Sequence, residues 1–281
     1  MTKIEWCNES WNWLVGCSRI SPECDRCYAA VAAKSPRLQQ FPQYQGVENW
    51  DGTVNFVESQ LSKPLGWKKP RKIFTCSMSD VFHPSVPDEW RDKAFAVMAI
   101  ANQHTYQVLT KRTQVMFDYF SQPDLGDRLA KAVEKNFLHI SPCLGHLMDE
   151  LEESAFLPNC WLGTTAGCQD SVKQRLPILS KLTKQGWTTF VSAEPLLGNL
   201  NLRLDMFPVS QVIAGAESGR GARVMDEDWV RSLRDQCQEN GVAFFYKQNV
   251  VKGKKVSLPE LDGKVWTEFP CNIKAKPGSL V

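Results

Sequence analysis

Three cysteines lie close together near the amino end of the chain, in the stretch VGCSRISPECDRCYA. Cys17, Cys24 and Cys27 have the spacing C-x6-C-x2-C. Thiolates are soft metal ligands, and short cysteine runs are typical of metal sites. A structural zinc site needs four ligands, and the chain has neither a second C-x2-C pair nor an H-x3–5-H pair to supply the fourth. The cysteines could also be thiols that bind nothing.

A third interpretation of the cysteines is a 4Fe–4S cluster that has three protein ligands and one open iron. An open iron can be chelated by a small molecule, and S-adenosylmethionine can do this through its amino and carboxylate groups. Electron transfer from the reduced cluster into the sulfonium breaks a carbon–sulfur bond and releases a 5′-deoxyadenosyl radical. Three ligands would then be the number that the chemistry needs.

Composition sets the class of protein but not its partner. The chain has 281 residues, is 43% hydrophobic and carries a net charge of +2, which fits one large α/β domain or two small ones. This charge is too small to indicate nucleic acid by itself, although five basic residues cluster at Lys63, Lys68, Lys69, Arg71 and Lys72. Without a recognisable targeting signal or a long apolar run, we expect a cytoplasmic protein with no membrane partner. In that compartment ten cysteines do not indicate disulfides.

Strand-like and helix-like segments alternate along the chain, and this alternation predicts a parallel sheet with helices outside it. Expected strands cover residues 10–16, 71–77, 105–110, 160–165, 188–195, 210–218 and 242–248. Expected helices cover residues 24–34, 87–102, 169–183 and 226–240. The pattern fits a partial barrel as well as a doubly wound sheet. Two longer excursions, 35–70 and 121–158, could act as lids or face a substrate.

Polar residues follow each expected strand. Because functional groups of such folds gather at the carboxyl ends of the strands, these residues predict a shared site. They are Ser77, Ser79, Asp80, Thr110, Lys111, Arg112, Thr164, Thr165, Gln169, Ser192, Glu194, Glu217, Ser218, Lys247 and Gln248.

Several longer motifs make the sequence familiar. The opening TKIEWCNESWNWLVGCSRISPECDRCYA is followed by SMSDVFHPSVPDEW, WLGTT, FVSAEPLLG, VIAGAESG and LDGKVWTEFP. Together they resemble the phage Gp37/Gp68-like family, which has a three-cysteine motif and is similar to the radical S-adenosylmethionine superfamily near the spore photoproduct lyase-like group. The resemblance covers almost the whole chain apart from residues 35–60 and 121–158.

The resemblance implies a partial (β/α) barrel of about six to seven parallel strands over residues 1–250, with a C-terminal extension at 251–281. It implies that Cys17, Cys24 and Cys27 hold a 4Fe–4S cluster and that S-adenosylmethionine lies across the top of the barrel. By position, Ser77, Ser79 and Asp80 would recognise the methionine amino group, and Thr110 and Lys111 would lie beside the cofactor. The adenosyl and substrate side would be lined by Ser192, Glu194, Glu217 and Ser218, with Lys247 on the last strand.

The chain departs from the family pattern at several positions. Cys7 stands where a Thr-like residue is expected, Trp13 replaces a proline, Ala216 replaces a glycine, and residues 166–168 read AGC where a VEN-like sequence is expected. The last change indicates a diverged substrate. Cys168 is our candidate catalytic residue, because a thiol near the cofactor could donate a hydrogen atom to a product radical. An inert, half-buried cysteine is the alternative.

The resemblance also implies partners. The reduced cluster would need an electron donor such as flavodoxin or ferredoxin, and a nucleobase, nucleotide or nucleic acid is the substrate class that analogy favours. Aromatic residues near the entrance could stack on a base, namely Trp11, Trp13, Tyr28, Phe82 and Trp161. Two other classes stay open: a non-enzymatic nucleic-acid-binding module with a structural metal, and a phage or defence accessory protein that works through a partner protein.

Overall fold

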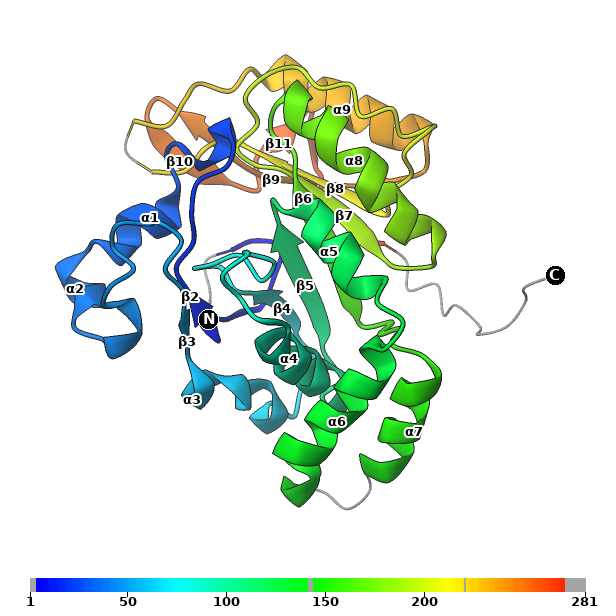
Figure 1. The fold of residues 1–281 in the computed structure, drawn as a ribbon. Helices are drawn as coiled ribbons and strands as arrows, with labels where there is room; N and C mark the ends of the chain where they lie inside the picture. The colour runs from blue at the N-terminus through cyan, green and yellow to red at the C-terminus, as the bar shows by residue number, and fades with distance from the viewer. Residues whose placement is uncertain (1–3, 141–143, 220, 271–281) are drawn as a thin grey trace.

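One curved sheet organises the chain (Figure 1). The computed structural model describes residues 4–140, 144–219 and 221–270. The sheet has the strand order β1-β4-β5-β6-β7-β8-β9-β10. The first seven run parallel, and β10 pairs antiparallel with β9. Their bounds are Glu9–Trp11 (β1), Lys72–Thr75 (β4), Thr105–Thr110 (β5), Cys160–Thr165 (β6), Thr189–Ala193 (β7), Gln211–Gly215 (β8), Ala243–Val251 (β9) and Lys254–Ser257 (β10).

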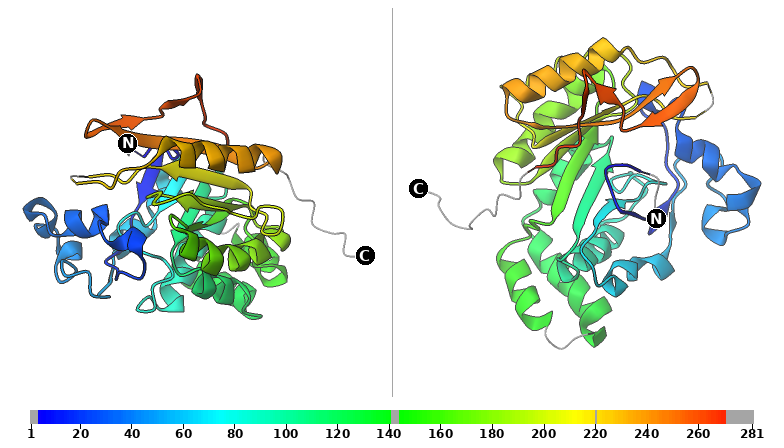
Figure 2. Two further views of the ribbon diagram at one scale, coloured as in Figure 1. Left: turned by 90° about the horizontal axis from the view of Figure 1, so that it is seen from above. Right: turned by 180° about the vertical axis from the view of Figure 1, so that it is seen from behind.

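Helices that connect successive parallel strands cover the outer face of this sheet, and the sheet curves into a half-barrel (Figures 1 and 2). These helices are α4 (Asp88–Ile100), α5 (Thr113–Phe120), α8 (Gln169–Lys184) and α9 (Glu227–Glu239). The segment before β4 holds α1 (Tyr28–Ala33), α2 (Pro36–Gln39) and α3 (Glu58–Leu61). The segment before β6 holds α6 (Leu125–Phe137) and α7 (Gly145–Glu153).

The predicted mixed α/β fold with a partial barrel agrees with this architecture, but the sheet has more strands than predicted. The additional strand, β10, lies in the segment expected to be a C-terminal extension, and residues 271–281 of that segment lie outside the described residues. The first expected strand, 10–16, is two strands. Only β1 joins the main sheet, whereas β2 (Leu14–Val15) pairs antiparallel with β3 (Asn55–Phe56).

The interior of the half-barrel is filled by large side chains. Phe74, Phe190 and Phe245 are buried there with Trp6 and Trp161. Gly163 of β6 makes room for this cluster, because a Cβ at that position would lie 2.3 Å from the Phe190 ring. Phe74 and Trp6 also line the cavity described below. The aromatic cluster therefore closes the half-barrel beneath the carboxyl ends of its strands.

The segment before β1 connects the two edges of the sheet. The carboxylate oxygen Oε1 of Glu5 lies 2.8 Å from Lys255 Nζ and accepts a hydrogen bond from Ser257 Oγ at 2.5 Å. Lys255 and Ser257 belong to β10, the edge strand opposite β1. Glu5 thus connects the segment before β1 to the opposite edge strand, β10, across the open side of the half-barrel.

The excursion at 121–158 is built from the helices α6 and α7, which pack on each other, and α6 also packs on α4 (Figure 1). No residue of this excursion lines the cavity in the described part of the chain, so the expected lid function has no support there. Among the residues described, no helix combines the length and the apolar character that crossing a bilayer requires.

Candidate functional site

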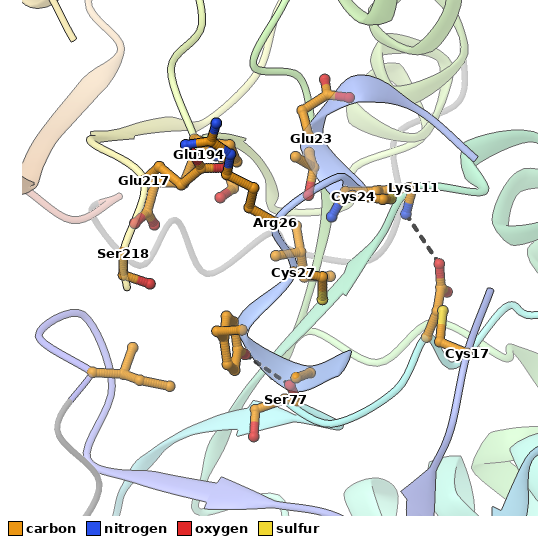
Figure 3. A pocket seen from close by; sticks show the side chains of 18 of the residues that line it. Cys17, Glu23, Cys24, Arg26, Cys27, Ser77, Lys111, Glu194, Glu217 and Ser218 are labelled. Atoms are coloured by element: carbon orange, nitrogen blue, oxygen red, sulfur yellow. Dashed lines mark hydrogen bonds and ion pairs between the residues drawn. The ribbon is translucent and has the colours of Figure 1, made fainter. Parts of the chain in front are cut away.

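A cavity of about 280 Å³ opens at the carboxyl ends of the parallel strands (Figure 3). All three cysteines of the amino-terminal cluster line it, and so do residues at or directly after the carboxyl ends of β4, β5, β6, β7 and β8, together with Lys247 and Gln248 of β9. The residues predicted for the cofactor that line it are Ser77, Ser79, Asp80, Thr110, Lys111, Ser192, Glu194, Glu217, Ser218 and Lys247. The structure therefore brings together every one of these predicted positions, whatever ligand they serve.

Local backbone features place the three thiols. Gly16, directly before Cys17, has a φ of +99°, and a Cβ there would lie 2.2 Å from the Thr53 carbonyl oxygen, so only glycine fits this turn. Cys24 ends a short 3-10 helix, Pro22–Cys24, and Cys27 stands directly before α1. In Figure 3, Cys27 lies in the middle of the cavity, between Cys17 on one side and Glu194 on the other.

The Cys17 thiol is held in its protonated form. Burial raises the pKa of Cys17 to about 12, and the nearby Asp80 carboxylate adds to this effect. Arg112 opposes it, with Nη1 at 3.6 Å from the Cys17 sulfur. Because a coordinating metal deprotonates a thiol outright, Cys17 needs such a partner to become a thiolate at neutral pH. In the described part of the chain, no three Cys, His, Asp or Glu side chains converge closely enough to bind one metal ion together.

Asp80 is the buried centre of a hydrogen-bond network. Its Oδ1 accepts from Thr110 Oγ1 at 2.6 Å and from the Phe82 backbone at 3.0 Å. Its Oδ2 accepts from Arg112 Nη1 at 2.9 Å and from the Lys111 backbone at 3.2 Å. Both oxygens are thus occupied by protein donors, and the carboxylate joins the ends of β4 and β5 and fixes Arg112 beside Cys17.

The two serines near Asp80 also have protein partners. Ser79 Oγ donates to the Gly16 carbonyl at 2.5 Å, and Ser77 Oγ donates to Asn12 Oδ1 at 3.1 Å. The Tyr28 hydroxyl donates to the Ser77 carbonyl at 2.7 Å. The end of β4 is therefore tied both to the turn before Cys17 and to the helix after Cys27.

Two ion pairs occupy the other side of the cavity. Lys247 Nζ of β9 lies 2.7 Å from Glu194 Oε1, which follows β7. Glu217, after β8, accepts from Arg223 at both oxygens, at 2.5 and 3.0 Å. Arg223 also donates to the Pro22 carbonyl at 3.1 Å. Burial raises the pKa of Glu217, but the hydrogen bonds from Arg223 outweigh this and lower it. The second pair thus fastens the loop after β8 to the cysteine loop.

Glu23, which the sequence did not single out, is the most enclosed acid of the cavity. The residue is 3% exposed, and its Oε1 accepts from the Gly167 backbone at 2.9 Å and lies 3.7 Å from Arg175 Nη1. Gly167 has no room for a side chain, because its Cβ would lie 1.9 Å from the Pro195 carbonyl and 3.0 Å from Glu23 Cγ. A carboxylate from the cysteine loop therefore fills the space beside the end of β6, where the sequence departs from the family pattern. The one feature of the sequence that could have pointed to Glu23 is its position directly before Cys24 of the cysteine cluster.

The pH dependence of stability should reveal Glu23. Burial raises the pKa of Glu23, but the polar hydroxyls of Ser171 and Ser21 and the backbone N–H groups beside the carboxylate outweigh it and hold the pKa at about 2, below its ordinary value of 4.5. Ionised Glu23 therefore stabilises the fold above pH ~4.5, and this contribution is lost as the pH falls toward ~2. We expect Glu23→Gln to lower the free energy of unfolding by on the order of 3 kcal/mol at pH 7, with the gap narrowing below pH ~4.

The measurement is urea denaturation of both chains between pH 7 and the lowest pH at which the wild type folds. Glu153, exposed on α7, provides the control, since Glu153→Gln should match the wild type throughout. If the difference in unfolding free energy between Glu23→Gln and the wild type stayed constant with pH, the low pKa assigned to Glu23 would be wrong.

Several predicted residues do not line the cavity. The Cys168 thiol lies at the start of α8, 3.3 Å from Ser171 Oγ and 3.7 Å from Glu23 Oε1. Cys7 is buried beside the aromatic cluster.

Of the five aromatic residues expected at the entrance, only Tyr28 lines the cavity; Trp11, Trp13, Phe82 and Trp161 are buried elsewhere. Trp6 and Trp50 line it instead. The chain turns sharply between β1 and β2, which buries both Trp11 and Trp13.

The basic cluster lies at the other end of the sheet. Lys72 begins β4, so the cluster is near the amino ends of the strands, and none of its residues lines the cavity. Arg71 pairs with Glu9 at 2.5 Å, and Lys72 Nζ lies 3.8 Å from the centre of the Phe269 ring. A ligand in the cavity does not contact these side chains.

The fold and the site together define a class: a mixed α/β protein whose mostly parallel half-barrel sheet carries a cysteine-lined cavity at its carboxyl edge. The chain belongs to a family of proteins of unknown function, DUF5131, whose model matches residues 1–270. Neither the comparison with curated proteins nor that with solved structures gave a match.

Proposed function

We propose that the chain is a radical S-adenosylmethionine enzyme, in which Cys17, Cys24 and Cys27 hold a 4Fe–4S cluster. The observation that carries the proposal is that all three thiols open into one cavity together with polar groups from the ends of the parallel strands. Nothing in the sequence spacing alone required the cysteines to meet residues as distant as Glu217 and Lys247.

The donor set fits such a cluster. In a four-iron cluster each cysteine binds a different iron, so three thiols need not converge as the ligands of a single ion do. Arg112 beside Cys17 would offset part of the cluster's negative charge. When bound and reduced, the cluster would supply the electron that cleaves S-adenosylmethionine and yields a 5′-deoxyadenosyl radical, which takes a hydrogen atom from a substrate.

The chain's own residues would prepare the site. Buried Asp80 holds Arg112, which donates to Ser18 of the cysteine loop. Buried Glu23 holds the same loop against the end of β6. Glu217 and Arg223 hold it against the loop after β8. Lys111, which lines the same cavity as Cys17, would supply a cation for a carboxylate of the cofactor. An electron donor such as flavodoxin or ferredoxin would act from outside, and a nucleotide or nucleic acid remains the proposed substrate class.

The test is anaerobic purification followed by metal and cofactor assays. We expect about four irons and about four sulfides per chain, together with slow formation of 5′-deoxyadenosine when dithionite and S-adenosylmethionine are added. Zinc without iron, and no cleavage of S-adenosylmethionine, would refute the proposal and favour a binding protein with a structural metal.

A further inference from the structure

The ion pair between Lys247 and Glu194 forms part of the cavity wall. The two side chains are 16% and 12% exposed. Removing charges from water is costly, so a mostly buried ion pair is weak support for stability. The pair engages one carboxylate oxygen and one ammonium N–H, and no other hydrogen bond to either side chain is present among the described residues. Among the residues described, one carboxylate oxygen and two ammonium N–H groups of these cavity-lining side chains thus remain available to a ligand.

The strands make room for this pair. Gly215, at the end of β8, lies between the strands that carry the two side chains, and a Cβ there would lie 3.0 Å from Glu194 Oε1. The pairing of β8 with β9 shifts register at Ala214 and Gly215. A side chain at 215 would press on the carboxylate, so the glycine allows Glu194 to reach across β8 toward Lys247.

The cavity that holds the pair also has aromatic residues in its wall. Trp6 and Phe74 line the same cavity, and so does Tyr28. The Tyr28 hydroxyl donates to the Ser77 carbonyl at 2.7 Å, which fixes its ring at the cavity wall. Flat apolar walls beside a charged donor and acceptor favour a planar ring that has a polar edge.

We infer that Lys247 and Glu194 bind the lactam edge of a substrate nucleobase. The ammonium would donate to the ring carbonyl, and the free carboxylate oxygen would accept from the adjacent ring N–H. Uracil, thymine and guanine carry such an edge. This inference rests on the proposed function, because it makes the bound base the substrate of the radical chemistry.

The experiment measures nucleoside binding to the iron-containing protein under anaerobic conditions by calorimetry. We expect uridine or guanosine to bind, and the corresponding 3-methyluridine or 1-methylguanosine, which lacks the ring N–H, to bind about 10- to 100-fold more weakly. Equal binding of the methylated nucleosides, or no binding of any nucleoside, would overturn the inference.

Variants show which side chains are responsible. Lys247→Met and Glu194→Gln should each weaken binding of the preferred nucleoside by about 10-fold or more and reduce its preference over the methylated form. Lys255→Met is the matched control, because Lys255 also lines the cavity in an ion pair, with Glu5 at 2.8 Å. Equal losses in Lys247→Met and Lys255→Met would show a general effect of charge and would overturn the inference.

A competition experiment distinguishes a substrate base from the cofactor. The adenine of S-adenosylmethionine also has an acceptor next to an N–H donor, so it could bind the same ion pair. Saturating S-adenosylmethionine should leave uridine or guanosine binding in place. If it displaces the nucleoside, the ion pair holds the cofactor's adenine and the inference is wrong. Protein that contains iron and cleaves S-adenosylmethionine but binds no nucleoside would overturn this inference alone, whereas protein without iron would overturn the proposed function.

Discussion

Replacing Cys17, Cys24 or Cys27 with alanine is expected to reduce bound iron from about four per chain to less than about one and to abolish formation of 5′-deoxyadenosine. Each thiolate would bind a separate iron, and the described residues offer no group of metal-ligating side chains that could substitute for it. Loss of one thiolate would leave a second iron without a protein ligand, so the protein would no longer hold the cluster. Iron and sulfide analysis of anaerobically purified variants measures the first effect, and chromatography of the reaction with dithionite measures the second.

Cys168→Ala is the matched control for this series. Its thiol lies near the cysteine loop, 3.7 Å from Glu23, but does not line the cavity. We expect this variant to keep its iron, and circular dichroism should show that all four variants are folded. Retention of iron by each of the three cluster variants would contradict the assignment of the ligands. If Cys168→Ala were the one variant to lose its iron, Cys168 would have to be a ligand in place of one of the three cysteines.

Much of the site followed from one topological rule. In a parallel sheet the carboxyl ends of neighbouring strands share an edge, so polar residues at 77–80, 110–111, 192–194, 217–218 and 247 had to gather. The rule needs only the strand assignments, and the buried apolar segments at β5 and β6 begin and end at the predicted residues. It could not reveal which polar groups are already used by the protein. Asp80 appeared in the sequence as a ligand-binding acid, yet its four donors come from the chain itself.

Other features depend on contacts between distant segments. Glu23 meets Gly167, which is 144 residues away, and no local pattern marks that contact. β10 follows β9 through the turn at Lys252 and Gly253, but its side chains are exposed on both faces and lack the alternation that marks a strand. Trp11 and Trp13 come shortly before the cysteine loop in the sequence, and they were expected at the entrance of the site. They are buried because the segment between them leaves the main sheet for a second one.

Replacing Asp80 with alanine is expected to lower the free energy of unfolding by on the order of 3–5 kcal/mol. The substitution removes the acceptor of four hydrogen bonds and leaves the Arg112 guanidinium, whose side chain is 8% exposed, without its carboxylate. Removing one partner of a buried ion pair costs the desolvation of the other, which is why this effect exceeds that of a surface pair. Urea denaturation of the anaerobically purified protein measures it.

Glu89→Ala provides the comparison. Glu89 pairs with Lys93 at 3.2 Å on the surface of α4, with a side chain that is 65% exposed, so its loss should cost at most about 1 kcal/mol. Similar losses in the two variants would show that Asp80 is not the centre of the network. If Asp80 is that centre, Asp80→Ala should also release Arg112 from its position beside Cys17, and bound iron should fall with stability. Because Glu89 lies far from the cysteine loop on the outer helix layer, iron should be unchanged in Glu89→Ala, which separates a specific effect on the loop from general destabilisation.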